Sequence, residues 1–134
     1  MKILALFGRS GSGKTTAIES LIELFVGRGL SVGAIKHTHH ALNTDDRGDT
    51  RRFRRAGANP VILAGDGEAV IFDGDGVLRV EYGTASDLVE RFQTDLLFIE
   101  GFRGAGTWPS VELAAGHWKE IEELAALVES PLHG

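Results

Sequence analysis

Short apolar runs separated by polar and glycine-rich segments divide the first part of this chain into strand, helix and strand. Residues 3–7 form an apolar run of strand length. Apolar residues then recur at three- and four-residue spacing, which predicts an amphipathic helix; they are Ile18, Leu21, Ile22 and Phe25. Glycines at 27 and 29 predict the end of that helix, and residues 31–36 return to a strand pattern. This order predicts a right-handed unit with parallel strands.

The rest of the pattern extends this unit with further strands and helices. A short helix up to Ala56 is expected, capped by Asp49 or Thr50. After this helix we expect strands at 60–64, 68–72 and 77–82, and then a helix at 87–92 capped by Ser86 or Thr84. Strands at 96–99 and 111–113 and a closing helix at 118–128 are expected in the rest of the chain. Asp-Gly-Asp-Gly at 73–76 predicts a hairpin turn. Residues 96–99 are apolar throughout, which is typical of a central parallel strand.

The turn between the first strand and the first helix carries the clearest chemical signal. Residues 8–16 read Gly-Arg-Ser-Gly-Ser-Gly-Lys-Thr-Thr and satisfy the phosphate-loop pattern G-x-x-x-x-G-K-[ST]. Glycine lets backbone amides turn inward, where they and the helix N-terminus attract phosphate oxygens. The Lys14 ammonium is expected to bind the β- and γ-phosphates, and the Thr15 hydroxyl is expected to be a ligand of Mg²⁺. The expected phosphate-binding set is Gly8, Ser10, Gly11, Ser12, Gly13, Lys14, Thr15 and Thr16.

The elements and the loop together predict an α/β fold of the P-loop NTPase-like type, with residues 1–134 as a single nucleotide-binding domain. The expected architecture is a three-layer sandwich: a mostly parallel central sheet, helices on both faces, and a β-hairpin insertion. Ligands bind beyond the carboxyl ends of the strands in such sheets. Glu100 follows the apolar strand at that rim, where Mg²⁺ beside phosphates needs a carboxylate, so Thr15 and Glu100 are the expected metal ligands.

Further polar residues are expected at the same rim, because residues 36–40 follow the second strand and read Lys-His-Thr-His-His. The histidines suggest a transition-metal site, but no cysteine or helical H-x-x-x-H accompanies them. The preferred interpretation is a polar loop whose imidazoles donate hydrogen bonds near phosphate or substrate. Lys36 and His37 therefore join the expected nucleotide-binding set, as does Arg103 from the glycine-rich loop at 101–106.

One face of the expected helix up to Ala56 is strongly basic. Its arginines recur at three- and four-residue offsets, at positions 47, 51, 54 and 55. Either an anionic partner or neighbouring carboxylates on a solvated surface helix would account for this face.

Composition limits the classes of protein that fit. The absence of cysteine excludes disulfides and thiolate metal sites. The formal charge of -5 argues against a general nucleic-acid binder. No apolar run is long enough to span a bilayer and no signal-peptide pattern precedes the first strand, so no membrane association is expected and the cytoplasm is the expected location.

Four segments, in this order, resemble the molybdopterin-guanine dinucleotide biosynthesis protein B (MobB) family. They are the phosphate loop, the segment 35–40 (Ile-Lys-His-Thr-His-His), the segment 46–50 (Asp-Arg-Gly-Asp-Thr) leading into 54–58 (Arg-Arg-Ala-Gly-Ala), and the segment 98–103 (Phe-Ile-Glu-Gly-Phe-Arg). The resemblance covers about residues 1–113.

The resemblance implies a GTP-binding protein with weak intrinsic GTPase activity, commonly a homodimer. It also implies an accessory role beside the guanylyltransferase that attaches GMP to molybdopterin. In that interpretation Lys14 stabilises charge on the triphosphate, and Glu100 and Asp46 serve Mg²⁺ or orient the attacking water. The arginine face would meet the pterin phosphate, the partner enzyme or a second subunit's nucleotide.

The chain departs from the family pattern in two places. Ser110 follows Pro109 where members usually carry lysine, and only one helix fits after Leu113. No Asn-Lys-x-Asp segment occurs, so the preference for guanine rests on the resemblance alone.

Two alternatives remain open on the residues: a small-metabolite P-loop kinase, and a metallochaperone-type nucleotide switch that uses the histidines at 37, 39 and 40.

Overall fold

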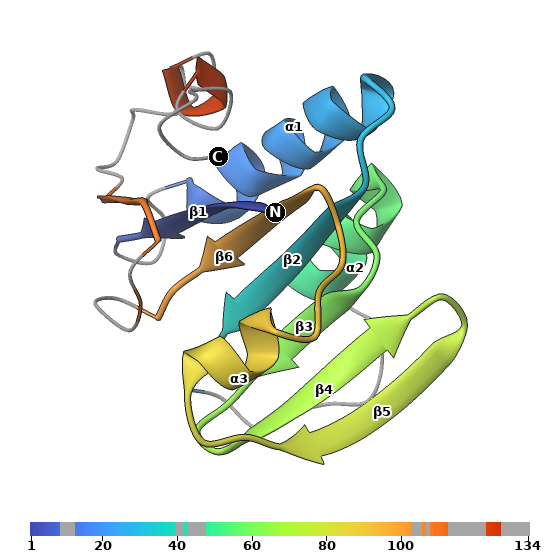
Figure 1. Cartoon of the computed structure of the whole chain (residues 1–134), viewed down its shortest axis with the longest axis vertical. Coiled ribbons are helices and arrows are strands. Elements are labelled where there is room, and N and C mark those ends of the chain that lie inside the picture. The colour runs from blue at the N-terminus through green and yellow to red at the C-terminus, as the bar shows by residue number, and fades with distance from the viewer. Residues whose placement is uncertain are drawn as a thin grey trace.

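The structure is a computed structural model of the 134-residue chain. It describes residues 1–8, 13–39, 42, 48–102, 106, 108–112 and 123–126. Within these residues, seven strands form one mixed sheet in the order β5-β4-β3-β2-β6-β1-β7 (Figure 1). The strands are β1 (Lys2–Phe7), β2 (Val32–His37), β3 (Val61–Ala64), β4 (Glu68–Asp73), β5 (Gly76–Glu81), β6 (Leu96–Glu100) and β7 (Ser110–Glu112).

The sheet is parallel from β3 to β7 and antiparallel at its other edge. β6 lies between β1 and β2 and is parallel to both, while β4 pairs antiparallel with β3 and with β5. The predicted hairpin is therefore confirmed. It extends the central sheet, because β4 continues the ladder from β3.

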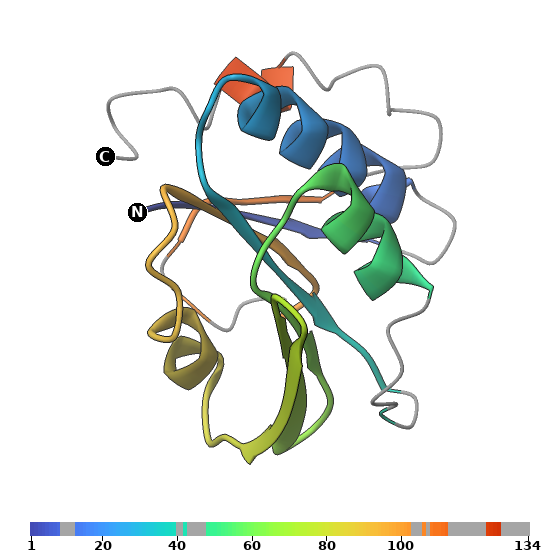
Figure 2. The same cartoon turned by 90° about the vertical axis from the view of Figure 1, so that its right-hand side faces the viewer.

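Helices cover both faces of the sheet, as the alternation of strands and helices predicts. Helices α1 (Lys14–Gly27) and α2 (Asp49–Ala56) lie on one face, and α3 (Ala85–Val89) lies on the other (Figure 2). Residues 123–126 form a further helical stretch; the rest of the helix predicted at 118–128 lies outside the described residues. No helix in the described part of the chain is both long and apolar enough to cross a bilayer.

Two apolar clusters hold these layers together, because successive strand side chains point to opposite faces. The cluster under α1 and α2 includes Phe25, Phe53 and Phe98. The cluster on the α3 face includes Ile35, Ile62 and Ile99. The four apolar positions predicted to face inward from the first helix are all buried: Ile18, Leu21, Ile22 and Phe25.

The predicted cap of α2 and the predicted first residue of α3 were wrong, whereas Thr84, one of the two caps predicted for α3, is confirmed. The cap of α2 is Gly48, with φ at 66°, so Asp49 is the first helical residue and not the cap. Helix α3 begins at Ala85 and not at residue 87, because Thr84 and Asp87 form a capping box that starts it earlier. That helix ends at Val89, and Phe92 is buried in the loop beyond it.

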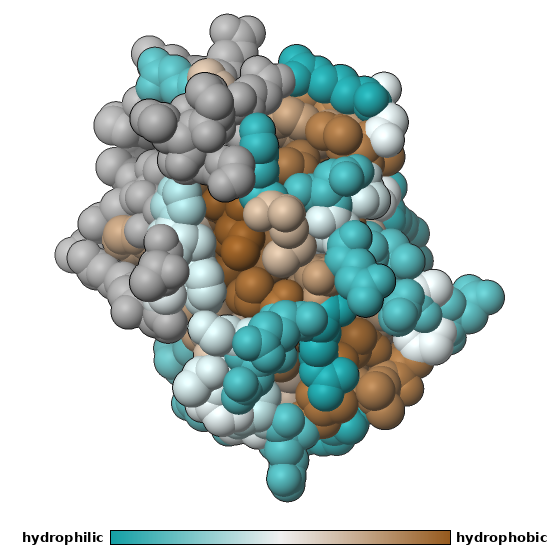
Figure 3. All heavy atoms as spheres, in the orientation of Figure 1, coloured by the Kyte–Doolittle hydropathy of each residue, from teal (hydrophilic) through white to brown (hydrophobic). Residues whose placement is uncertain are grey.

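The outer part of the hairpin carries two neighbouring exposed apolar residues. Val77 and Leu78 of β5 are 49% and 55% exposed. Figure 3 shows the corresponding apolar surface over β5 near the hairpin turn.

Candidate nucleotide-binding site

The phosphate loop joins β1 to α1 at the carboxyl end of the parallel strands. Gly8 and Gly13 have φ values of 151° and 91°, a region that side chains disfavour, so glycine suits both ends of the loop. Gly13 is the N-cap of α1, and Lys14 Nζ donates a hydrogen bond to the Gly8 carbonyl oxygen at 2.9 Å. Ser10, Gly11 and Ser12 lie outside the described residues.

Thr15 meets two carboxylates at the start of α1. Its Oγ1 lies 2.7 Å from Glu100 Oε1 and 3.2 Å from Asp49 Oδ2, and its hydroxyl donates to one of them at a time. The Glu100 side chain is only 5% exposed, although it is formally charged. Such a buried carboxylate requires partners, because desolvating an isolated charge is costly.

Lys36 supplies the positive charge between these carboxylates. Its Nζ forms ion pairs with Glu100 Oε2 and Asp49 Oδ2. Burial alone would lower the pKa of Lys36, but its hydrogen bonds to Asp49 and Glu100 and their charges outweigh burial, so the pKa is raised. The ammonium therefore stays charged and neutralises part of the acidic pair.

Strand register explains why these residues converge. β6 lies between β1 and β2, so Glu100 pairs with Leu6 on one side and Lys36 on the other. Lys36 follows Val32 and Ala34 at alternate positions, which places it on the face covered by α1 and α2. The end of β6 is held by Gly101, whose backbone N–H donates to the Leu6 carbonyl oxygen at 2.9 Å.

The donor set suits a hard divalent cation. One hydroxyl and two carboxylates, from Thr15, Glu100 and Asp49, offer only oxygen ligands, which is the ligand type that Mg²⁺ prefers. These residues fit Mg²⁺ beside a phosphate loop, and sequence reasoning identified two of them. Asp49 was missed as a ligand because it was assigned to the cap of α2. Asp46 and Arg103 lie outside the described residues.

Helix α2 reaches the site because it is clamped to α1. Arg52 Nε and Nη2 donate to the two carboxylate oxygens of Glu19 at 3.0 Å each, and Nη2 lies 3.3 Å from Thr16 Oγ1. The hydrogen bond from Arg52 holds the pKa of Glu19 below its usual range. This clamp positions Asp49, which lies three residues earlier on α2, beside Thr15.

The predicted arginine face of α2 is divided in the structure. Arg54 lies 5.6 Å from the Phe72 ring and donates to the Gly74 carbonyl oxygen, so it braces α2 against the hairpin. Arg51 and Arg55 are exposed, and Arg47 lies outside the described residues. Of the three described arginines of this face, Arg51 and Arg55 thus point to solvent and Arg54 packs against the hairpin.

His37 lies on the opposite face of the sheet from Lys36. Its ring stacks on Phe102 with centroids 4.2 Å apart and planes inclined by 14°. The structure thus separates two residues that the sequence placed in one nucleotide-binding set: Lys36 contacts the carboxylate pair, and His37 belongs to the α3 side.

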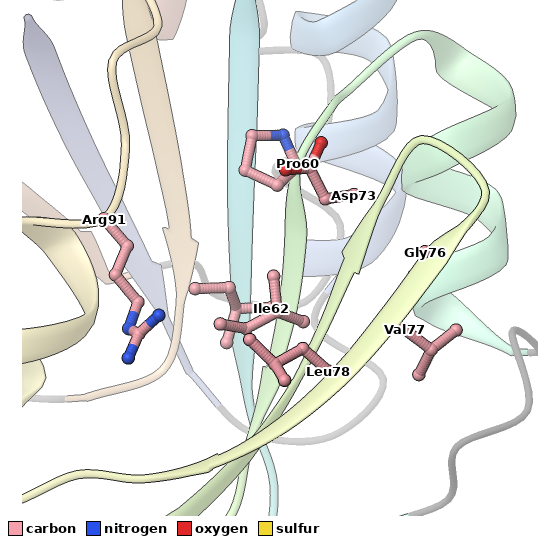
Figure 4. Close-up of a pocket in the computed structure, with 8 residues that line it drawn as sticks. Pro60, Ile62, Asp73, Gly76, Val77, Leu78 and Arg91 are labelled. Atoms are coloured by element: carbon pink, nitrogen blue, oxygen red, sulfur yellow. The ribbon is translucent and has the colours of Figure 1, made fainter.

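A hollow of about 370 Å³ lies elsewhere on the molecule (Figure 4). Ile62, Leu78 and Arg91 are among the residues that line it. It also borders Pro60, which precedes β3, so it lies toward the amino end of that strand and away from the phosphate loop.

The fold and the site define a P-loop nucleotide-binding protein of the α/β class, the type that the sequence predicts. The family described as Molybdopterin guanine dinucleotide synthesis protein B, or MobB, matches residues 3–129. The chain belongs to the MobB family, and the resemblance drawn from its motifs is confirmed.

Similar proteins carry names that agree with this family. Two are called molybdopterin-guanine dinucleotide biosynthesis adapter protein. The protein from Haemophilus influenzae is 38% identical over 103 residues, which are 75% of this chain and 57% of that protein. The protein from Escherichia coli is 33% identical over 103 residues, 75% of this chain and 59% of that protein. This chain thus spans less than two thirds of either relative.

A crystal structure of Bacillus subtilis MobB has a similar fold. It superposes with a TM-score of 0.55 at 27% identity, over 94% of this chain and 73% of that chain. The predicted fold class is therefore confirmed.

Proposed function

We propose that this protein binds GTP with Mg²⁺ and acts as an accessory factor in molybdopterin-guanine dinucleotide formation, assisting the guanylyltransferase as a homodimer. The observation that carries the proposal is the convergence of Thr15, Glu100 and Asp49 beside the phosphate loop. The names of the relatives support the pathway, since they are adapter proteins of molybdopterin-guanine dinucleotide biosynthesis.

Each described residue of the site has a proposed task. Lys14 would bind the β- and γ-phosphates in place of the Gly8 carbonyl oxygen, and Thr15, Glu100 and Asp49 would hold Mg²⁺. Mg²⁺ supplies charge neutralisation at the phosphate oxygens. Lys36 balances the carboxylates when the cation is absent, which keeps the acidic pair ordered.

Weak hydrolysis is the expected activity for such a site. Water is the proposed nucleophile, and charge stabilisation by Lys14 and an arginine from a second subunit would provide most of the rate effect. Slow turnover suits an adapter, because the GTP-bound form then persists long enough to engage the partner enzyme.

Calorimetric titration of GTP and of ATP, each with and without Mg²⁺, tests the proposal. We expect tighter binding of GTP, and we expect Lys14→Ala and Glu100→Gln to weaken Mg²⁺-dependent binding. Glu68→Gln is the matched control, because Glu68 forms an exposed ion pair with Arg79. A preference for ATP would contradict the guanine assignment, and unchanged binding by Lys14→Ala would contradict the phosphate-loop assignment.

A guanylyltransferase assay tests the accessory role separately. Adding the protein with GTP should increase molybdopterin-guanine dinucleotide formation by the partner enzyme, and the Lys14→Ala variant should increase it much less. An equal effect of parent and variant would show that nucleotide binding is not what assists the partner.

A further inference from the structure

Two histidines and an aspartate gather at the ends of β2 and β3, on the face opposite the carboxylate pair. His37 Nε2 lies 3.2 Å from Asp66 Oδ1, and His39 Nδ1 lies 3.8 Å from Asp66 Oδ2. One ligand atom from each of the three side chains lies within 4.8 Å of the other two. Asp66 is distant from the histidines in sequence, so the histidine segment alone did not reveal this set.

The spacing suits a metal ion of the zinc class. Zinc bonds to imidazole nitrogen and carboxylate oxygen are about 2.0–2.2 Å long, which places tetrahedral ligand atoms about 3.3–3.6 Å apart. The His37 and His39 nitrogens lie 3.2 and 3.8 Å from Asp66, each from a different carboxylate oxygen, and the separations within one set of three ligand atoms extend up to 4.8 Å. Side-chain rotation would draw the set together, and it is open to His39 and Asp66 because they are 80% and 79% exposed.

His37 is held in place from beneath. Its ring stacks on Phe102, whose backbone has a φ of 55°, a conformation that an aromatic residue rarely adopts. Gly101 allows the close approach, because a Cβ at that position would lie 2.9 Å from the His37 Cβ. The chain thus uses an unusual backbone conformation to place a ring against the histidine, and this packing restricts the rotation of the His37 ring.

The turn that carries Asp66 is linked through Tyr82 to the same Phe102 ring that stacks on His37. Gly65 N–H donates to the Glu68 carbonyl oxygen at 2.8 Å, which closes the turn between β3 and β4. The Tyr82 hydroxyl donates to the Gly65 carbonyl oxygen, and the Tyr82 ring meets Phe102 edge-on with centroids 6.3 Å apart. One aromatic pair therefore supports both the histidine side and the aspartate side of the cluster.

The ligand type separates this cluster from the nucleotide site. Imidazole nitrogens favour zinc and similar transition metals, whereas the oxygen-only set at Thr15, Glu100 and Asp49 favours Mg²⁺. Lys36 and His37 are consecutive residues of a strand and point to opposite faces. The two sites therefore lie back to back across the end of β2.

We propose that His37, His39 and Asp66 form a site for a divalent transition-metal ion of the zinc class, with three protein ligands and a coordination position left for a further ligand. Metal binding would replace the His37–Asp66 hydrogen bond with direct coordination. The proposal does not depend on the identity of the nucleotide.

Titration of nucleotide-free protein with Zn²⁺ in a non-chelating buffer tests the site. We expect one equivalent to bind, and we expect His39→Ala and Asp66→Asn each to weaken binding at least about tenfold, as is usual when a metal site loses a ligand or its support. Both side chains are exposed, so neither replacement disturbs the core. Co²⁺ provides a second readout, because the intense visible absorption of a tetrahedral site should appear in the parent protein and be lost in the double variant.

One matched variant separates this cluster from other acidic groups. Asp75→Asn changes an exposed aspartate in the hairpin turn. It should retain the full zinc stoichiometry. The proposal is overturned if the parent binds no stoichiometric Zn²⁺, if the His39→Ala/Asp66→Asn double variant binds it as tightly as the parent, or if Asp75→Asn weakens binding to the same extent.

Discussion

Thr15 Oγ1 lies 2.7 Å from Glu100 Oε1, although 85 residues separate them in the sequence. The contact exists because β1 leads into the phosphate loop and β6, its neighbour in the sheet, ends at Glu100. The hydroxyl of the loop and the acidic end of the central strand therefore occupy one site.

Asp49→Asn should weaken Mg²⁺-dependent nucleotide binding less than Glu100→Gln does. Glu100 is the more buried carboxylate and lies nearer to Thr15, at 2.7 Å compared with 3.2 Å for Asp49. For Asp49→Asn we expect a loss within the roughly 10- to 100-fold range of residues that support a metal site. Calorimetry with and without Mg²⁺ measures both variants; a larger loss for Asp49→Asn would reverse the assigned order of importance.

Lys36→Met should destabilise the protein and make its stability depend on Mg²⁺. Removing the ammonium leaves Glu100 and Asp49 facing each other without a cation. We expect a loss on the order of 2 kcal/mol in the free energy of unfolding, below the cost of breaking a fully buried pair, because Asp49 is partly exposed. Mg²⁺ should restore part of this loss, since it supplies the missing positive charge.

Urea denaturation with and without Mg²⁺ measures the effect of Lys36→Met. Arg79→Met is the matched control, because Arg79 pairs with Glu68 at the surface, where each side chain is 49% exposed. The control should change stability by less than about 1 kcal/mol, with no response to Mg²⁺. Equal behaviour of the two variants would argue against a cation site at the carboxylate pair.

Gly33→Ala and Gly27→Ala should have opposite effects on stability. A Cβ at Gly33 in β2 would lie 2.3 Å from a carbon of the Phe92 ring, so alanine overpacks the core at an expected cost of about 1–3 kcal/mol. A Cβ at Gly27 in α1 meets nothing within 4 Å, and alanine there should stabilise the helix by about 0.5–1 kcal/mol. Thermal unfolding of both variants would test the packing of Phe92, and no loss for Gly33→Ala would contradict it.

The stability contributed by Asp95 should disappear in acid. The backbone N–H and hydroxyl of Ser31 both donate to Asp95 Oδ2, at 2.9 and 3.0 Å, and these hydrogen bonds lower the pKa of Asp95 below 3.8. A lowered folded-state pKa means that the carboxylate stabilises the fold above the unfolded-state value and loses this effect as pH falls through the folded-state value. Parent and Asp95→Asn proteins should therefore differ most above the ordinary pKa of aspartate and converge as the pH falls below the lowered pKa of Asp95. A difference in unfolding free energy that did not change with pH would contradict this account.

Local patterns in the sequence determined much of the fold. The spacing of Ile18, Leu21 and Ile22 predicted the buried face of α1, and the Asp-Gly-Asp-Gly segment predicted the hairpin between β4 and β5. The phosphate loop and the apolar strand before Glu100 could be identified because each signal lies within a few consecutive residues. Such signals depend on the backbone preferences of the residues and on the spacing of apolar positions along the chain. Residues close together in the sequence determine both.

Tertiary structure decided which distant groups meet. The order of strands placed Glu100 beside Lys36, and the clamp from Arg52 to Glu19 brought Asp49 to Thr15. Register on the other face brought Asp66 to the histidines. These contacts depend on the pairing of strands and the docking of helices far apart in sequence. The pairing of strands and the docking of helices are determined by the burial of the whole apolar core. A short stretch of sequence therefore cannot predict them.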